Sequence, residues 1–332
     1  MKRRITVLVM GLGLGLASHA VLAQNIKIGH FGSPGNAFDQ GVELFIQKLE
    51  ELSEGDITAT NYPSGQLGNE SQQVASLRGG LQEILITSST NLIRYNPLLQ
   101  LIDLPFLFED DAETDEVLLG TLGRGMLDGL DGRGMYGLTF WDNGFRDLSN
   151  SQRPIEKLED FQGLDFRVIG EPIYIDTFRA LGANPVPMPF PEVYSALETN
   201  TVDGQDNPLL TVRDMHFYEV QDYLTHSKHA YSAMVVLAGA PFWNRLTDAQ
   251  KAVIQQAAIE AGQEQRRIMR DEVAHAKDYL AEEGGMTVSE FAPESLEGIR
   301  MAVQPVIENH VTEEARPIYE QITQMLEQLR SS

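Results

Sequence analysis

The sequence contains no cysteine among its 332 residues. Disulfide bridges, thiolate-bound metals, cysteine nucleophiles and iron–sulfur clusters are therefore excluded together. A chain without thiols suits an oxidising compartment such as the periplasm, where a free thiol is a hazard.

Basic residues are also scarce, with 25 lysines and arginines against 48 aspartates and glutamates and a net charge of −23. A field of this sign repels phosphate backbones and anionic lipid surfaces, so we expect no nucleic-acid partner. Excess acid is typical of a solvated surface. A halophilic or marine host would be a second reason for the same composition.

Long apolar runs are absent after residue 23, so we expect no embedding of the mature chain in a membrane. The first residues combine a basic start (2–4), an uncharged apolar run (5–16) and small residues before Gln24. This pattern predicts a cleaved secretory signal over residues 1–23 and a periplasmic location. The alternative is a transmembrane anchor, but the run is shorter than the roughly 20 residues that span a bilayer.

Catalytic motifs are missing as well: the sequence has no G-x-S-x-G, no Walker loop and no S-x-x-K set. Its seven histidines are scattered, and His226 and His229 have no H-E-x-x-H context. We therefore expect neither catalysis nor a metal or cofactor.

What is present is an alternation of strand and helix patterns. Strands at 26–31, 57–62 and 84–87 alternate with helices at 37–52 and 70–77, which predicts an α/β fold around a mostly parallel sheet.

The alternation then continues along the rest of the chain. Further strands are predicted at 135–141, 164–168, 184–188, 201–202 and 234–238, and further helices at 173–181 and 191–198. A capping box at Thr247 begins the longest helix, which we expect to reach about Ala281, and the tail from Pro293 is helical with interruptions at its prolines.

Two arginines stand at predicted strand edges, Arg146 and Arg167. An arginine at the end of a strand can point into the crevice where open α/β sheets bind ligands. Its guanidinium fork matches a carboxylate with two parallel hydrogen bonds. The alternative is a structural salt bridge to a nearby acid: Asp142, Asp147 or Asp165.

The segment 203–208 and Phe190 each allow a structural and a ligand-binding interpretation. The polar segment 203–208 is either a surface turn or a segment that offers the amide of Asn207 to a cleft. Phe190, between two prolines, is either a core residue or a pocket wall.

Several motifs, in order and spacing, resemble the substrate-binding proteins of TRAP (tripartite ATP-independent periplasmic) transporters. The matching segments are Tyr62–Glu70, Leu104–Phe108, Asn143–Arg146, Leu158–Gly163 with Arg167, Leu181–Met188, Glu192–Leu197 and Val202–Pro208. The resemblance implies two α/β domains, joined by crossover strands and a long spanning helix, that close on a ligand. We expect domain I to comprise 24–145 plus 233–272, and domain II 146–232 plus 273–332.

The resemblance also implies site residues. Arg167 matches the arginine that forms the main salt bridge to a ligand carboxylate, and Arg146 matches one that gives a second polar contact. Asn207 and Phe190 match the asparagine and the aromatic residue of the cleft. Gly170 stands where sialic-acid binders carry an asparagine, which argues against sialic acid.

Further candidates follow the first and third predicted strands, with side chains suited to a polyol. They are His30 after the first strand, and Ser88, Ser89 and Asn91 after the third. Glu70 belongs to the L-G-x-E pattern of the resemblance, although helix capping is an alternative role for it.

These residues offer many neutral hydrogen-bonding groups but only two cations, so we expect a hexuronate such as glucuronate or galacturonate, delivered to TRAP membrane permease subunits. A C4-dicarboxylate or a 2-oxo acid is the alternative ligand. An extracytoplasmic carbohydrate-active enzyme is the alternative class, and it would need a pair of carboxylates about 5–9 Å apart in the cleft.

Overall fold

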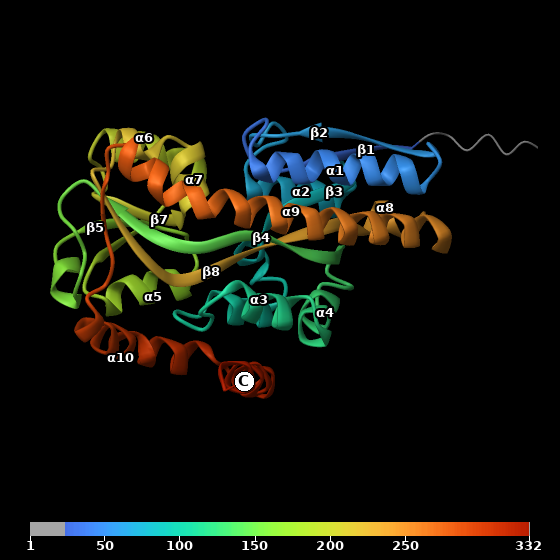
Figure 1. Cartoon of the computed structure of the whole chain (residues 1–332). Helices are drawn as coiled ribbons and strands as arrows, with labels where there is room; N and C mark the ends of the chain where they lie inside the picture. The colour runs from blue at the N-terminus through green and yellow to red at the C-terminus, as the bar shows by residue number, and fades with distance from the viewer. Residues whose placement is uncertain (1–23, 332) are drawn as a thin grey trace, which may run out of the picture.

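The structure is a computed structural model that describes residues 24–331 (Figure 1). The predicted signal, 1–23, lies outside the described residues. Within 24–331, none of the helices combines the length and the apolar character needed to cross a membrane.

One mixed sheet of nine strands organises the protein, in the order β2-β1-β3-β8-β4-β7-β5-β6, with β9 paired to β8. The strands are β1 (Gln24–Gly29), β2 (Ile57–Tyr62), β3 (Ile84–Ser88), β4 (Met135–Asn150), β5 (Asp165–Val168), β6 (Asn184–Pro187), β7 (Gly204–Pro208), β8 (Tyr223–Gly239) and β9 (Thr287–Ser289). β1 pairs in parallel with β2 and β3, and β5 pairs in parallel with β6 and β7. β8 pairs antiparallel with β3 and β4, and β4 also pairs antiparallel with β7. The predicted α/β class is confirmed, with a central antiparallel pair that joins two parallel ends.

That central pair is much longer than the sequence indicated. β4 has 16 residues and β8 has 17, and they stay paired from Met135 opposite Gly239 to Asn150 opposite Tyr223. The second half of β4 and the first half of β8 carry many polar residues that are buried. An alternation of apolar and polar residues therefore does not reveal these halves in the sequence. Two of the predicted domain boundaries, 145/146 and 232/233, fall inside these two strands, and the third, 272/273, falls inside the helix over 248–282. The division into 24–145 plus 233–272 and 146–232 plus 273–332 stays a prediction.

The interpretation of 203–208 as a turn is wrong, and so is the short strand at 201–202. Gly204–Pro208 forms β7, fully buried between β4 and β5. The strand is polar because its side chains have buried partners: Gln205 donates to the Ser149 hydroxyl over 2.8 Å, and Asp206 pairs with Arg146.

The helices cover both faces of the sheet (Figure 1). The α-helices of six or more residues are α1 (Ala37–Leu52), α2 (Glu70–Gly79), α3 (Asp111–Leu118), α4 (Thr121–Asp128), α5 (Pro172–Ala180), α6 (Val193–Glu198), α7 (Leu209–Asp214), α9 (Asp248–Glu282), α10 (Pro293–His310) and α11 (Arg316–Arg330). The other helical segments are the four-residue α8 (Ala240–Trp243) and the 3-10 segments η1 (Ser89–Leu92), η2 (Pro97–Asp103), η3 (Leu158–Phe161), η4 (Phe190–Glu192) and η5 (Phe217–Glu219). The capping box at Thr247 begins α9, as predicted, whereas α10 continues through Pro305.

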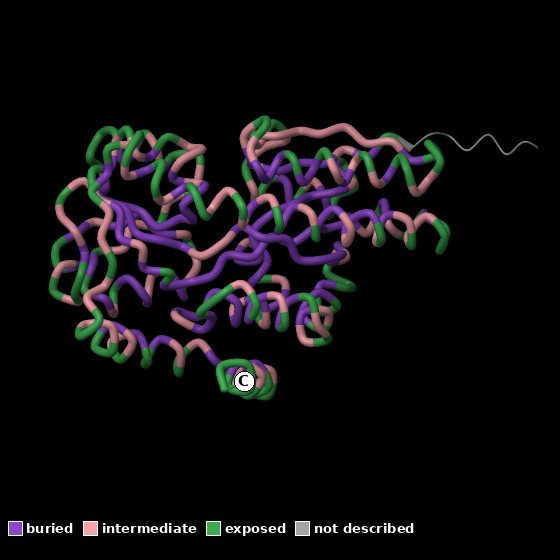
Figure 2. Tube along the Cα trace, in the orientation of Figure 1, coloured by how far each residue is buried: buried purple, intermediate pink, exposed green. Residues whose placement is uncertain are grey.

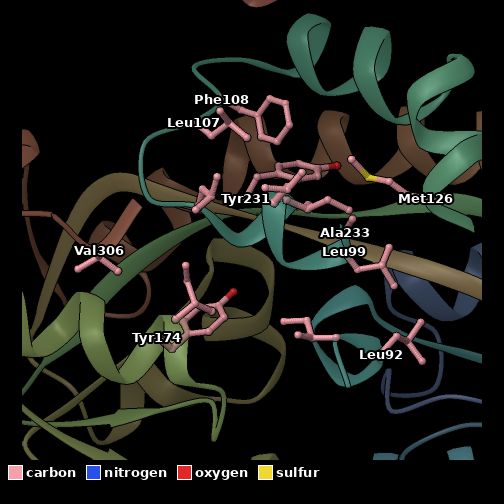
Figure 3. Close-up of a cluster of buried hydrophobic side chains, with 14 of the residues drawn as sticks. Leu92, Leu99, Leu107, Phe108, Met126, Tyr174, Tyr231, Ala233 and Val306 are labelled. Carbon is pink, nitrogen blue, oxygen red and sulfur yellow. The ribbon is translucent and has the colours of Figure 1, made fainter. Parts of the chain in front are cut away.

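Buried hydrophobic side chains form two clusters. In Figure 2 the buried residues follow the central strands of the sheet. One cluster joins the η2 segment, α5, α10 and α11 to the sheet, and Figure 3 shows Tyr174, Tyr231 and Leu99 within it. The other packs α1 and α9 on the sheet around Trp141, whose indole donates to the Ala258 carbonyl over 3.0 Å.

Candidate functional site

A cavity of about 340 Å³ lies where segments from both parallel ends of the sheet meet. One wall comes from the start of α2 and the segment after β3, the other from the end of β5 and residues 187–191. Most of the residues predicted from the sequence line it: Glu70, Ser88, Asn91, Arg146, Arg167, Phe190 and Asn207.

A second cavity, of about 360 Å³, lies between α10, α11 and residues 104–107. Its cations are paired: Arg330 with Glu113 over 2.6 Å, and Arg300 with Glu109 over 3.7 Å. Since neither cation is left without a carboxylate, the first cavity is the better candidate for an acidic ligand.

Arg167 is a buried cation on β5, with only 3% of its surface exposed. Its Nε and Nη2 donate to the carbonyl of Met188 over 3.1 and 2.8 Å. It forms no ion pair with any residue in 24–331, so the alternative of a structural salt bridge is not observed for Arg167. Burial lowers the pKa of its guanidinium to about 10, and the group still carries its charge at neutral pH.

Arg146 is buried too, but it is already paired. Its Nε lies 2.6 Å from Oδ2 of Asp206, and its Nη2 donates to the Asp206 carbonyl. Burial opposes ionisation of Asp206, yet the charge of Arg146 holds the pKa of that carboxyl well below its usual range. The salt-bridge alternative thus applies to Arg146, with Asp206 as partner in place of the nearby acids considered from the sequence.

Glu70 is the first residue of α2 and lies in the cavity. Asn69, the N-cap residue, closes the capping box with Gln72, so capping is not the role of Glu70. Burial raises the pKa of the Glu70 carboxyl, while the charge of Arg167 and a hydrogen bond from Asn91 lower it. The carboxyl of Glu70 therefore lies close to the guanidinium of Arg167. Arg167 is the cation of this cavity that has no ion pair within 24–331.

His30 and Ser89 do not line the cavity, contrary to the prediction. His30 is 1% exposed, and its Nε2 lies 2.8 Å from Oδ1 of Asn61, between β1, β2 and α1. Ser89 is fully buried in η1. Both residues follow a strand that ends near the cavity. This position in the sequence does not determine the direction in which their side chains point.

Several polar lining residues were not predicted. They are Asn69, Ser71, Thr90, Asn143, Glu171, Thr211 and Ser232. Asn143 donates to the Ser232 hydroxyl over 3.1 Å, across β4 and β8. Asn143 belongs to the same motif as Arg146, a signal that could have found it, whereas Ser232 lies in the part of β8 that was not recognised as a strand.

Within 24–331, no group of three or more acidic or histidine side chains could hold a metal ion. The arrangement is instead a binding cavity: a desolvated guanidinium surrounded by hydroxyls, amides and the carboxyls of Glu70 and Glu171.

Comparison with known proteins agrees with this geometry. The model of the family DctP, described as bacterial extracellular solute-binding protein, family 7, matches residues 28–314. The chain belongs to this family.

Two relatives illustrate the match. The 2,3-diketo-L-gulonate-binding periplasmic protein YiaO of Escherichia coli is 32% identical, covering 87% of this chain and 88% of its own. A sugar acid binding protein of Advenella mimigardefordensis, solved with galactonate, is 36% identical with a TM-score of 0.88, covering 91% and 97% of the two chains.

A third relative carries a different acid. A TRAP periplasmic solute binding protein of Sulfurospirillum deleyianum, solved with succinate, is 30% identical with a TM-score of 0.84, covering 91% and 99%. The family membership confirms the TRAP resemblance and the two-domain binding-protein fold. Its members are solute-binding proteins and not enzymes, so the predicted class is confirmed as well.

Proposed function

We propose that this family 7 protein captures a six-carbon sugar acid with one carboxylate and delivers it to a TRAP membrane permease. A hexuronate such as glucuronate or galacturonate remains the leading candidate. The galactonate and diketogulonate bound by two relatives are six-carbon sugar acids as well. Periplasmic location and cleavage after residue 23 belong to the same proposal.

The observation that carries the proposal is the state of Arg167. A buried guanidinium without a carboxylate partner in 24–331 is costly, because it has lost its hydration without a counter-charge. A ligand carboxylate supplies that counter-charge and matches the donor geometry of the arginine. We therefore assign the ligand carboxylate to Arg167.

The remaining charges favour one carboxylate over two. Arg146 is neutralised by Asp206, and the other charged lining residues, Glu70 and Glu171, are acids. A second carboxylate on a short ligand would meet no further free cation in this lining and would be repelled by these acids. Neutral hydrogen-bonding groups such as those of Ser88, Asn91 and Asn207 suit the hydroxyls of a sugar acid instead.

A C4-dicarboxylate or a 2-oxo acid is the second candidate, because the Sulfurospirillum relative was solved with succinate. The discriminating experiment is a thermal-shift screen of the mature protein, followed by calorimetry on each hit. The panel contains glucuronate, galacturonate, galactonate, succinate, malate and pyruvate. At 100 times its Kd a ligand adds roughly 2.7 kcal/mol to the free energy of unfolding.

We expect the six-carbon sugar acids to bind most tightly. Tighter binding of succinate or malate than of any sugar acid in the panel would reject the proposed ligand class.

A further inference from the structure

A chain of hydrogen-bonded hydroxyls lies in the wall that follows β3. Ser88 Oγ donates to Thr90 Oγ1 over 3.0 Å, and Thr90 Oγ1 donates to Oδ1 of Asp103 over 2.9 Å. Ser88 and Thr90 line the ligand cavity, whereas Asp103 lies behind them in η2 with 2% of its surface exposed.

Asp103 also binds a hydroxyl from the opposite end of the sheet. Tyr174 of α5 donates to the same Oδ1 over 2.7 Å. α5 follows β5, which is separated from β3 by β8, β4 and β7 in the sheet order. In Figure 3 the Tyr174 ring extends from its helix toward the interior. One carboxyl oxygen thus anchors elements that meet at the cavity from both sides.

The direction of this chain is fixed by the chemistry of its end. A hydroxyl has a single proton to donate, and an oxygen of an ionised carboxylate can only accept, here from Thr90 and Tyr174. Burial raises the pKa of Asp103 to about 7, but a proton on Oδ2 would leave Oδ1 an acceptor. Thr90 must therefore donate to Asp103, and Ser88 must donate to Thr90.

We propose that Asp103 is a positioning residue that makes the Ser88–Thr90 wall an acceptor of hydrogen bonds from the ligand. Ser88 Oγ also accepts from the backbone N–H of Thr90 over 3.3 Å. With its proton committed to Thr90, the Ser88 hydroxyl therefore presents its remaining lone pair to the cavity. This wall accepts a ligand hydroxyl and repels the lone pairs of a carboxylate. The inference deepens the proposed function and rests on it, because it assigns the discrimination between hydroxy acids and dicarboxylates to a particular wall.

The experiment measures the ratio of the succinate Kd to the galacturonate Kd by calorimetry. In Thr90→Val the Ser88 hydroxyl loses its acceptor and is free to donate into the cavity. We expect the ratio to fall about tenfold, the effect of one hydrogen bond. Ser88→Ala, a smaller change, should weaken galacturonate binding about tenfold and leave succinate binding within twofold.

Two further variants separate positioning from general damage to the core. Asp103→Asn keeps an acceptor oxygen for Thr90 and Tyr174, and should keep the ratio within threefold of wild type. Tyr231→Phe removes a similar buried bond, from Tyr231 to Oδ1 of Asp142 over 2.6 Å, and Tyr231 does not line the cavity. It should leave the ratio within twofold.

The outcomes distinguish this inference from the proposed function. A wild-type protein that prefers succinate rejects the proposed function. A wild-type protein that prefers galacturonate, together with folded Thr90→Val and Ser88→Ala variants whose ratios stay within twofold of it, overturns the role of Asp103. A fall of more than threefold in the Kd ratio of Asp103→Asn overturns the role of Asp103 as well. An acceptor oxygen for Thr90 and Tyr174 would then not be enough to maintain the discrimination.

Discussion

Two buried arginines, Arg146 and Arg167, lie in the same cavity and differ in one respect: the presence of a carboxylate. Arg146 has Asp206, and removal of either member would leave the other charge buried and alone, which costs about 3–5 kcal/mol of stability. Variants of Arg146 therefore report mainly on folding. Within 24–331 the hydrogen bonds of Arg167 go only to the Met188 carbonyl, so its variants report on the ligand.

We predict that Arg167 contributes more to ligand affinity than any other side chain. Arg167→Ala should weaken binding by about 2–5 kcal/mol, roughly 30-fold to several thousand-fold, because the ligand carboxylate would be buried unpaired. Arg167→Lys should recover part of the loss, since an ammonium keeps the charge but not the fork. Titration calorimetry measures both, with circular dichroism to check the fold.

The matched control for this series is Arg153, whose guanidinium also donates to backbone carbonyls, those of Asp160 and Gln162, away from the cavity. Arg153→Ala should bind ligand like wild type. A folded Arg167→Ala that binds within threefold of wild type would contradict the assignment of the carboxylate to Arg167.

For single residues, the sequence predicts which residues lie near the site better than it predicts where their side chains point. Arg167, Asn207 and Glu70 were predicted from motifs of the family resemblance, and all three line the cavity. His30 was predicted only from its position after the first strand, and its side chain turns to Asn61. Asp206 was not recognised as the partner of Arg146 because the two are distant in sequence and meet only when β4 pairs with β7.

Among the elements, amphipathic helices and apolar strands were predictable and polar buried strands were not. α1 and β2 have the predicted bounds because their apolar residues follow a clear period. β7 contains Gln205, Asp206 and Asn207 and reads as a turn, since local sequence does not reveal that each polar group has a buried partner.

The close approach of α9 to β4 gives a prediction at the scale of elements. A Cβ added to Gly262 would lie 2.5 Å from Nε1 of Trp141, whose ring is 1% exposed and held by its bond to Ala258. Alanine favours a helix by about 1 kcal/mol over glycine. The clash should outweigh this gain, so Gly262→Ala should lower the free energy of unfolding by about 1–2 kcal/mol in urea denaturation.

Gly125 in α4 provides the comparison, because a Cβ there would meet no atom within 4 Å. Gly125→Ala should leave the free energy of unfolding unchanged or raise it by up to about 1 kcal/mol. Equal effects of the two substitutions would show that the contact with Trp141 imposes no constraint.

For the whole molecule, we predict that ligand binding closes the cleft. Contacts already join its two sides at the rim: the rings of Phe31 and Phe190 lie 5.6 Å apart, and the Ser33 hydroxyl lies 3.9 Å from the sulfur of Met215. A ligand that touches both walls adds contacts to the closed state and so raises its population. X-ray scattering should show a smaller radius of gyration for the ligand-bound protein than for the free protein.

The same measurement on Arg167→Ala at an equal ligand concentration is the control, since weaker binding should leave the radius close to that of the free protein. A radius that does not change when wild type is saturated would rule out closure.

The pairing of β3 with β8 also has a consequence for how the protein is made. Ser88 lies opposite Met234, so β3 has no antiparallel neighbour until most of the polypeptide has left the ribosome. Such distant pairings slow folding, because a long loop must close before any contact rewards it. A nascent chain that stays open for longer is easier to thread through a translocation pore, which suits the export that residues 1–23 predict. The central strands that shape the binding cleft would then also set the time at which this protein can fold.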